Sequence, residues 1–305
     1  MLQAAIRGLG ACALVFFTLA SRCGQEPSLE ITGIGKDAMS LTRELVAMGP
    51  RPPGSAGIER VRQWIGRKAA DRGLAVDTEA FQARTPIGEI EMKNLFALVA
   101  GRNGNEQVLL LAHYDSKRFV GMDFVGANDS ACAVALLLAM IPSLREARYP
   151  FDVRLAFVDG EEALVSWSRR DSLYGSRHLA AALGSQKKTR AVIVLDMIGD
   201  ADLKLIRSAD SDPRLQDIVT DLLRREGRED LLERTPLRVE DDQLPFSEAG
   251  IPALHLMDFT YGGRTSPGRF WHTPQDTVDK ISDRSLSIVG QLTLGVLGRM
   301  SAKAD

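Results

Sequence analysis

The sequence predicts an α/β fold: a single domain with a mixed, mostly parallel central sheet flanked by helices on both faces. From residue 107 onward, short apolar runs alternate with helical patterns, and such strands are typical of a parallel sheet covered on both sides. The chain has 305 residues, 45% hydrophobic and 26% charged, which allows one large α/β domain or two small ones. It contains no internal repeat and no long linker, so we expect one domain.

The elements follow in order along the chain. Helical periodicity covers residues 36–48 and 56–73, which are separated by the Pro- and Gly-rich stretch GPRPPGSAG. Strand patterns follow at 74–83 and 90–100. Strands then alternate with helices in the order strand 107–115, helix 130–145, strand 152–160, helix 172–184, strand 190–199, helix 213–226, strand 251–258 and helix 282–301.

The N-terminal residues have the pattern of an export signal. Arg7 precedes an apolar run over residues 9–20, which is short for a bilayer span but typical of a secretory signal. We expect a signal peptide or signal anchor over 1–25, a periplasmic or secreted protein, and membrane attachment only through this leader. Cys23 stands where a lipidated cysteine would, although Arg22 is a poor cleavage residue. An amphipathic N-terminal helix is the alternative.

Charge and cysteine content exclude several functional classes. The net charge is −2 and no basic cluster is present, which argues against a nucleic-acid partner. Only Cys12, Cys23 and Cys132 occur, so we expect no disulfide framework. Cys132 lies in the apolar helical stretch SACAVALLLAM, where cysteine behaves as a small hydrophobic residue rather than a catalytic thiol.

Acidic and histidine side chains stand at the ends of successive predicted strands and at the start of the next helix: His113, Asp115, Asp129, Glu161, Glu162 and Asp196. Parallel strands place their carboxyl ends at one rim of a sheet, where ligands bind. So many carboxylates on one rim need a positive partner, and O and N ligands suit zinc. Singly, Asp129 could cap a helix and His272 could be a surface residue; together, these residues favour a metal site.

Six motifs occur in the order found in a known family: HYDSK (113–117), GANDSA (126–131), DGEEA (159–163), LDMIGD (195–200), DDQLPF (241–246) and WHT (271–273). They resemble the zinc-dependent M28 aminopeptidase superfamily. Within it, WSRRDSLYGSRHLA (167–180), DSK and WHT resemble the glutaminyl-peptide cyclotransferases, or glutaminyl cyclases. The resemblance covers nearly the whole chain after the leader and implies an M28-like catalytic domain over 30–303.

The resemblance implies one zinc ion with three protein ligands: Asp129, Glu162 and His272. The open fourth position would take the substrate amide oxygen or a water molecule. Glu161 would be the general acid and base. Asp196 and Asp241 would form a hydrogen-bonded acid network with Glu161, Asp242 being the alternative to Asp241.

The resemblance also implies substrate-binding residues. Trp167 and Trp271 would wall the pocket for the glutamine side chain. His255 belongs near the site in the family, but its place in an apolar strand pattern equally suits a core histidine. Lys117 would help to balance the acidic rim, with a solvated lysine as the alternative.

His113 and Asp115 have two interpretations. In the two-metal aminopeptidases of the superfamily, residues at the places of His113 and Asp196 bind a second zinc ion, with Asp129 as the bridge. Alternatively, Asp115 orients the ring of His113 by a hydrogen bond. We expect one zinc ion, and the ligand types leave a second open.

The reaction we expect is the cyclisation of N-terminal glutamine in peptides or proteins, in which the α-amine attacks the side-chain amide carbon and ammonia leaves. The aromatic pair Trp167 and Trp271 favours a narrow slot, whereas an M28 aminopeptidase releasing N-terminal residues needs room for a water nucleophile and the chain beyond the scissile bond. A non-catalytic peptide-binding domain is a third hypothesis, disfavoured because the acid set that includes Glu161 is complete.

Overall fold

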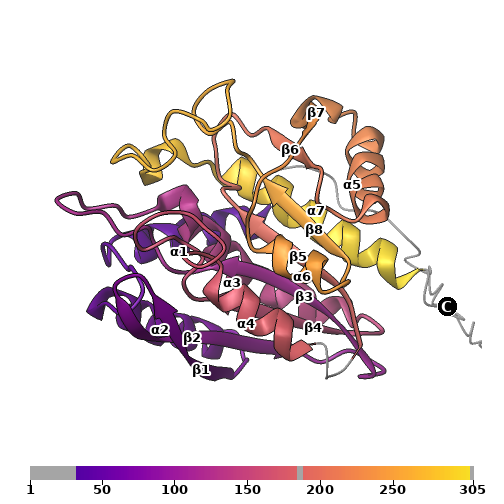
Figure 1. The fold of residues 1–305 in the computed structure, drawn as a ribbon. Coiled ribbons are helices and arrows are strands. Elements are labelled where there is room, and N and C mark those ends of the chain that lie inside the picture. The colour runs from indigo at the N-terminus through magenta and orange to yellow at the C-terminus, as the bar shows by residue number, and fades with distance from the viewer. Residues whose placement is uncertain (1–31, 184–187, 303–305) are drawn as a thin grey trace, which may run out of the picture.

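In the computed structural model, which describes residues 32–183 and 188–302, a six-stranded sheet crosses the protein in the order β1-β2-β4-β3-β5-β8 (Figure 1). The strands are β1 (Val76–Thr85), β2 (Gly88–Val99), β3 (Glu106–His113), β4 (Asp152–Val158), β5 (Lys188–Asp196) and β8 (Ala253–Met257). β4, β3, β5 and β8 pair in parallel, whereas β1 and β2 form a hairpin whose second strand runs antiparallel to β4. The predicted mixed, mostly parallel sheet is therefore confirmed.

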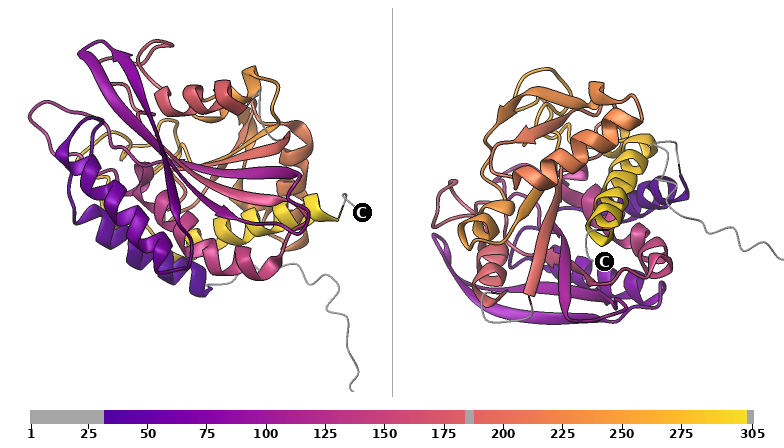
Figure 2. Two further views of the ribbon diagram at one scale, coloured as in Figure 1. Left: turned by 90° about the horizontal axis from the view of Figure 1, so that it is seen from below. Right: turned by 90° about the vertical axis from the view of Figure 1, so that its right-hand side faces the viewer.

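Helices cover both faces of the sheet (Figure 2). One face packs against α1 (Gly33–Val46), α2 (Ala56–Ala70), α3 (Cys132–Ala147) and α7 (Asp283–Ser301). The other packs against α4 (Tyr174–Leu183) and α6 (Gln243–Glu248), while α5 (Pro213–Arg225) lies beside α7 and β8. Neighbouring residues of β3 alternate between the layers, with Leu110 in the core under α3 and Leu111 in the core under α4, as a strand buried on both faces requires.

Residues 132–141 of α3 are all buried in the larger core. Residues 127–147 are long and apolar enough to cross a membrane by length and composition, but 89% of their most apolar window is buried inside the protein. Cys132 at its first position is buried and free. Because it is buried in this way, the apolar stretch is a core helix of the protein.

The sequence analysis did not predict several short elements. β6 (Leu205–Ser208) and β7 (Leu232–Leu237) form a separate two-stranded parallel sheet, and α6 has six residues. Short helical turns complete the fold: η1 (Ala127–Ala131), η2 (Glu229–Leu231) and η3 (Val278–Lys280). Such short segments show little periodicity. The predicted leader over 1–25 and Cys23 lie outside the described residues.

Candidate metal and catalytic centre

The acidic residues gather at the carboxyl edge of the parallel strands. His113 is the last residue of β3 and Asp196 the last of β5. Glu161 and Glu162 follow β4 in a loop, and Asp129 lies in the turn η1 before α3. All five side chains are buried. They meet because β3 lies between β4 and β5, so that the loops that leave these strands share one edge.

Asp129, Glu162 and His272 form the first cluster. Nε2 of His272 lies 2.9 Å from Oε1 of Glu162 and 3.3 Å from Oδ2 of Asp129. One ligand atom from each residue falls within 4.8 Å of the others. His272 comes from the long loop between β8 and α7 and has a positive φ of 54°. Three segments far apart in the sequence thus converge on one point.

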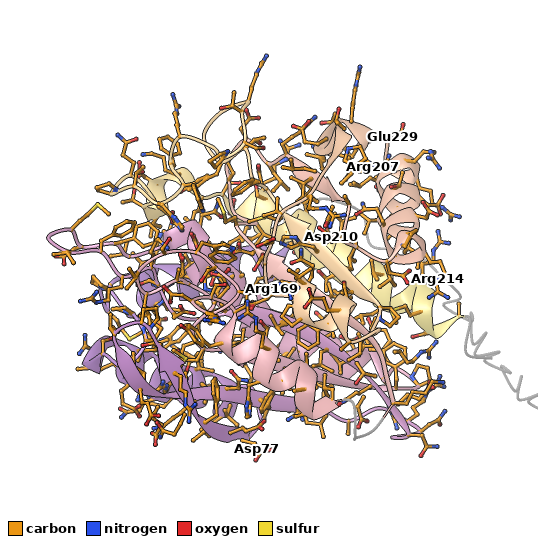
Figure 3. All side chains as sticks on the ribbon, in the orientation of Figure 1. Asp77, Arg169, Arg207, Asp210, Arg214 and Glu229 are labelled. Carbon is orange, nitrogen blue, oxygen red and sulfur yellow. The ribbon has the colours of Figure 1, made fainter. Side chains whose placement is uncertain are left out.

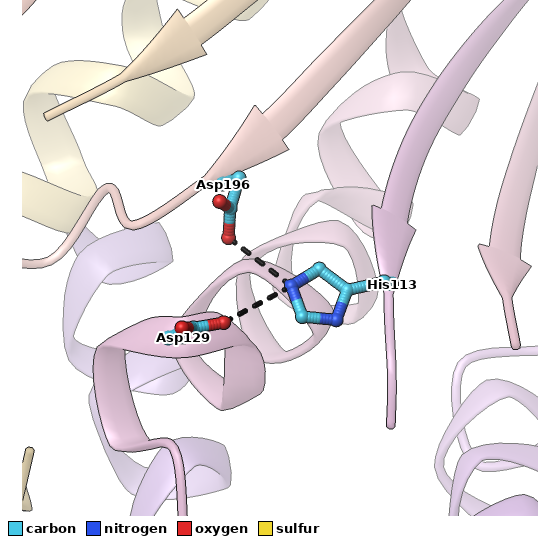
Figure 4. Close-up of side chains that lie close together, drawn as sticks. All are labelled: His113, Asp129 and Asp196. Atoms are coloured by element: carbon cyan, nitrogen blue, oxygen red, sulfur yellow. Dashed lines mark hydrogen bonds and ion pairs between the residues drawn. The ribbon is translucent and has the colours of Figure 1, made fainter. Parts of the chain in front are cut away.

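His113, Asp129 and Asp196 form the second cluster (Figure 4). Nε2 of His113 lies 3.2 Å from Oδ1 of Asp129 and 3.3 Å from Oδ1 of Asp196. Asp129 therefore presents one oxygen to each cluster. Two carboxylates and an imidazole at either place are donors of the kind that bind zinc.

Asp115 orders the loop behind the first cluster. Its carboxylate accepts the backbone N–H of Glu161 at 3.1 Å and that of Glu162 at 3.2 Å. Oδ1 of Asp115 also lies 3.4 Å from Nδ1 of His113. Because Asp115 is fully buried, one carboxylate fixes the backbone of both glutamates and faces the ring of His113.

Asp276 orders the turn that carries Asp129. Its carboxylate accepts the backbone N–H groups of Asn128 at 2.8 Å and Asp129 at 3.2 Å, and the hydroxyl of Tyr261 at 2.8 Å. Burial, followed by the charge of Asp129, raises the pKa of Asp276 to about 6. The sequence analysis missed Asp276. The sequence feature that could have pointed to it is its position four residues after His272, in WHTPQD.

A second residue that the sequence analysis missed is Arg51, from the GPRPPGSAG stretch. Its fully buried guanidinium donates to the carbonyl oxygens of Tyr114 at 2.8 Å and Gly126 at 3.0 Å, and to that of Val125. Burial lowers the pKa of Arg51 to about 10, although the charges of Asp115 and Asp129 oppose this change. Arg51 thus joins the two ends of the loop after β3, and it brings a positive charge close to the acidic rim.

The carboxyl groups around Glu161 differ in proton affinity. Burial, with the charges of Glu162 and Asp241, raises the pKa of Glu161 well above its usual value. Burial and the charge of Asp241 raise the pKa of Asp196 to about 7. Burial acts on Asp241 too, but His255, the charge of His113 and the backbone N–H of Asp242 together outweigh it and lower the pKa of Asp241. Groups with separated pKa values are typical of proton-transfer sites.

His255 and Asp242 lie deep beside Asp241. Nε2 of His255 is 2.7 Å from Oδ2 of Asp241, without the alignment of a hydrogen bond. His255 and Asp242 are fully buried. Burial and the neighbouring charge of Asp241 raise the pKa of Asp242 well above its usual value. Asp241, not Asp242, borders the cavity.

Two of the cations near the site, Lys117 and His272, face the first cluster. Nζ of Lys117 lies 3.0 Å from Oε2 of Glu162. Burial disfavours a charge on His272, but Glu162 and Asp129 outweigh this effect and raise its pKa to about 9. At neutral pH these two cations balance Glu162 and Asp129, as a divalent ion would at the same place.

A cavity of about 340 Å³ opens onto the clusters. Trp271 stacks on the ring of His272, with ring centroids 3.9 Å apart, and Phe259 meets Trp271 edge-on. Trp167 lines the same cavity, and its Nε1 donates to Oε2 of Glu240 at 3.2 Å. The sequence analysis missed five of the lining residues: Arg238, Val239, Glu240, Met257 and Phe259.

The comparisons with known proteins show the family to which this chain belongs. The family model described as "Peptidase family M28" matches residues 94–297. A glutaminyl-peptide cyclotransferase of Drosophila melanogaster is 30% identical over 261 residues, covering 76% of this chain and 72% of that protein. This chain belongs to peptidase family M28, in its glutaminyl-peptide cyclotransferase branch. The predicted family is therefore confirmed.

Two further members of this branch extend the comparison. A glutaminyl-peptide cyclotransferase-like protein of Mus musculus is 33% identical over 74% of this chain, which spans 66% of the mouse protein, just under two thirds. The crystal structure of a glutaminyl cyclase from an Acidobacteriales bacterium is 35% identical, with a TM-score of 0.82, and covers 97% of this chain and 100% of its own. The glutaminyl cyclase likeness therefore extends over nearly the whole chain.

Proposed function

We propose that this protein is a glutaminyl-peptide cyclotransferase, which converts the N-terminal glutamine of peptides or proteins to pyroglutamate and releases ammonia. The observation that carries the proposal is the convergence of Asp129, Glu162 and His272 on a cavity lined by Trp167 and Trp271, in a chain related to glutaminyl cyclases over most of its length.

Asp129, Glu162 and His272 are the residues that would hold one zinc ion. Two carboxylates and one imidazole leave a position open, which is typical of catalytic zinc sites. When bound, the ion would polarise the side-chain amide carbonyl of the glutamine and stabilise the negative charge that develops on its oxygen.

Glu161 is the proposed general acid and base. The α-amine nitrogen forms a bond to the side-chain amide carbon, and the bond from that carbon to the amide nitrogen breaks. Glu161 takes a proton from the attacking nitrogen and returns it to the departing one, which leaves as ammonia. Its buried position at the cavity wall and its raised pKa support this role, because a carboxyl with high proton affinity holds a proton between the two transfers.

Asp196 and Asp241 are the proposed partners of Glu161 in proton transfer. Both line the cavity with it, and their negative charges favour its protonated form. Nε2 of His255 lies 2.7 Å from Oδ2 of Asp241, and His255 contributes to the lowered pKa of that carboxyl, against the effect of burial. We therefore propose that His255 acts indirectly, by helping to lower the pKa of Asp241.

Trp167 and Trp271 are the proposed walls for the glutamine side chain. The nucleophile and the amide belong to the same residue, so the protein has to fold that residue back on itself and exclude water. Flat aromatic rings on the cavity wall suit this task. Lys117 would balance the charge of Glu162 before the metal binds.

We also propose that the protein is exported and that the leader over residues 1–25, if retained or lipidated at Cys23, is its only membrane attachment. The apolar run over 9–20 supports this proposal. The net charge of −2 supports peptide substrates over nucleic acid.

A zinc aminopeptidase is the second candidate function. The second cluster of His113, Asp129 and Asp196 favours it, because it offers ligands for another metal ion that shares Asp129. The two activities differ in their products. An aminopeptidase shortens the chain by one residue, whereas a cyclase keeps every residue.

Mass spectrometry of a Gln-initiated peptide after incubation with the zinc-loaded protein tests the proposal. We expect the loss of one ammonia with no chain shortening. An N-acetylated copy of the peptide is the control, since its blocked α-amine cannot attack. Release of free glutamine would establish the aminopeptidase instead.

A further inference from the structure

We propose that Asp171 is a positioning residue for Trp167, because its buried carboxylate holds the loop that presents the indole to the cavity. The loop covers residues 163–172 and is called the tryptophan loop below. The inference rests on the proposed function in one respect: it takes Trp167 as a wall of the glutamine pocket.

The carboxylate of Asp171 lies inside the tryptophan loop and is 2% exposed. It accepts three consecutive backbone N–H groups, those of Leu164 at 2.9 Å, Val165 at 2.9 Å and Ser166 at 2.8 Å, and the hydroxyl of Tyr174 at 3.0 Å. Hydrogen bonds from N–H groups to a carboxylate are charge-assisted and stronger than neutral ones. Asp171 therefore fixes the backbone of the three residues immediately before Trp167.

Backbone hydrogen bonds close the base of the loop. The N–H of Leu173 donates to the carbonyl of Glu161 at 2.8 Å, and that of Tyr174 donates to the carbonyl of Gly160 at 2.8 Å. The loop thus leaves and re-enters the fold beside Glu161, the proposed acid and base. A shift in the loop moves Trp167 relative to the reacting atoms.

Other contacts also hold the tryptophan loop: Leu164 packs with Ala83 and Met92 in a small apolar cluster, and the hydroxyl of Tyr174 donates to the carbonyl of Arg170 at 3.0 Å. Residues 165–170 are exposed, with Val165 at 64% and Trp167 at 38%. Trp167 contacts Glu240 through its indole N–H, and Arg169, labelled in Figure 3, pairs with Glu248 at the end of α6. Exposed contacts of this kind contribute little to order. Among the described side chains, Asp171 accepts the largest number of backbone N–H groups from the loop.

This arrangement has a kinetic consequence. A wall that contacts the glutamine side chain acts in the ground state and in the transition state alike, so its loss raises KM more than it lowers kcat. We expect Asp171→Asn to raise KM for a Gln-initiated peptide roughly tenfold while kcat changes less than about threefold. Zinc affinity should stay unchanged, since the metal-binding residues do not contact Asp171.

A double-mutant cycle tests whether Asp171 acts through Trp167. Trp167→Ala, Asp171→Asn and the double variant are compared for KM. If Asp171 works by placing the indole, its replacement has almost no effect once the indole is gone. Asp212→Asn is the matched control, because Asp212 also accepts backbone N–H groups, at the start of α5, and lies away from the cavity. We expect wild-type KM from this control.

Limited proteolysis gives a readout that needs no activity. The exposed Arg169 and Arg170 are trypsin sites within the tryptophan loop. Loops that open locally are cut faster, so Asp171→Asn should be nicked after these arginines at least several-fold faster than the wild type and Asp212→Asn. Fragment masses identify the cut. Tyr174→Phe, which removes one donor to Asp171 and the hydrogen bond of the same hydroxyl to the carbonyl of Arg170, should give a smaller increase and serves if Asp171→Asn does not fold.

The possible results of these experiments distinguish the role of Asp171 from the proposed function. Wild-type KM and trypsin resistance in Asp171→Asn, or additive effects in the cycle, would overturn the role of Asp171. Absence of cyclisation in the wild type would overturn the proposed function, and the trypsin comparison would still decide whether Asp171 orders the loop. Faster cutting in Asp212→Asn as well would also count against the role, since it would reflect general loss of stability.

Discussion

The carboxylate of Asp276 accepts the backbone N–H of Asp129 at 3.2 Å, so the segment that carries His272 is fastened to the turn that carries Asp129. The two candidate ligands are far apart in the sequence, yet their relative position depends on one buried side chain. Residues that orient metal ligands by hydrogen bonds tune the affinity of the site for its metal.

We therefore expect Asp276→Asn to weaken zinc binding by about 10- to 100-fold, because the amide accepts fewer N–H bonds and carries no charge. Competition with a chromophoric chelator measures the dissociation constant. Asp279→Asn is the matched control, since Asp279 lies three residues further on and its side chain is 67% exposed. Equal zinc affinity in Asp276→Asn and the wild type would contradict the orienting role.

Replacing Glu161 by Gln separates catalysis from metal binding. The amide keeps the size of the carboxyl but cannot carry the proton, so we expect turnover of a Gln-initiated peptide to fall by about 10²- to 10⁴-fold. Zinc content, measured by elemental analysis, should remain that of the wild type. Glu162→Gln should instead lose zinc. Substantial turnover in Glu161→Gln would remove Glu161 from its proposed role.

The zinc affinity should also depend on pH. Burial lowers the pKa of His272, but Glu162 and Asp129 outweigh this effect and raise it to about 9. A metal ligand must be deprotonated, so below that pKa zinc has to displace a proton. The apparent affinity should rise about tenfold per pH unit from pH 6 to 8. Titrations at several pH values, corrected for the chelator, measure this slope, and a flat profile would contradict it.

The sequence predicted the sheet and the convergence of the site for one physical reason. Long apolar strands are recognisable, and their carboxyl ends must meet at one edge, which brings His113, Glu162 and Asp196 together. His272 was found differently, through the WHT motif and the family resemblance, since no strand end places it.

Asp276, Arg51 and Asp171 were not predicted, because each acts by hydrogen bonds to loop backbone. Such bonds depend on where a carbonyl or N–H points, which residue periodicity does not encode. β6 and β7 were missed for a related reason: they are short, and Pro236 interrupts the pattern of β7.

Zinc should also stabilise the fold, because Asp129, Glu162 and His272 come from three loops that the ion would join. A ligand at 100 times its dissociation constant stabilises the native state by about 2.7 kcal/mol, which corresponds to roughly 5 °C in Tm for a domain of this length. Chelation should lower Tm by this amount and added zinc should restore it, as differential scanning calorimetry measures. Glu162→Gln is the control and should show almost no zinc-dependent shift. An equal shift in that variant would mean that zinc stabilises the protein at some other place.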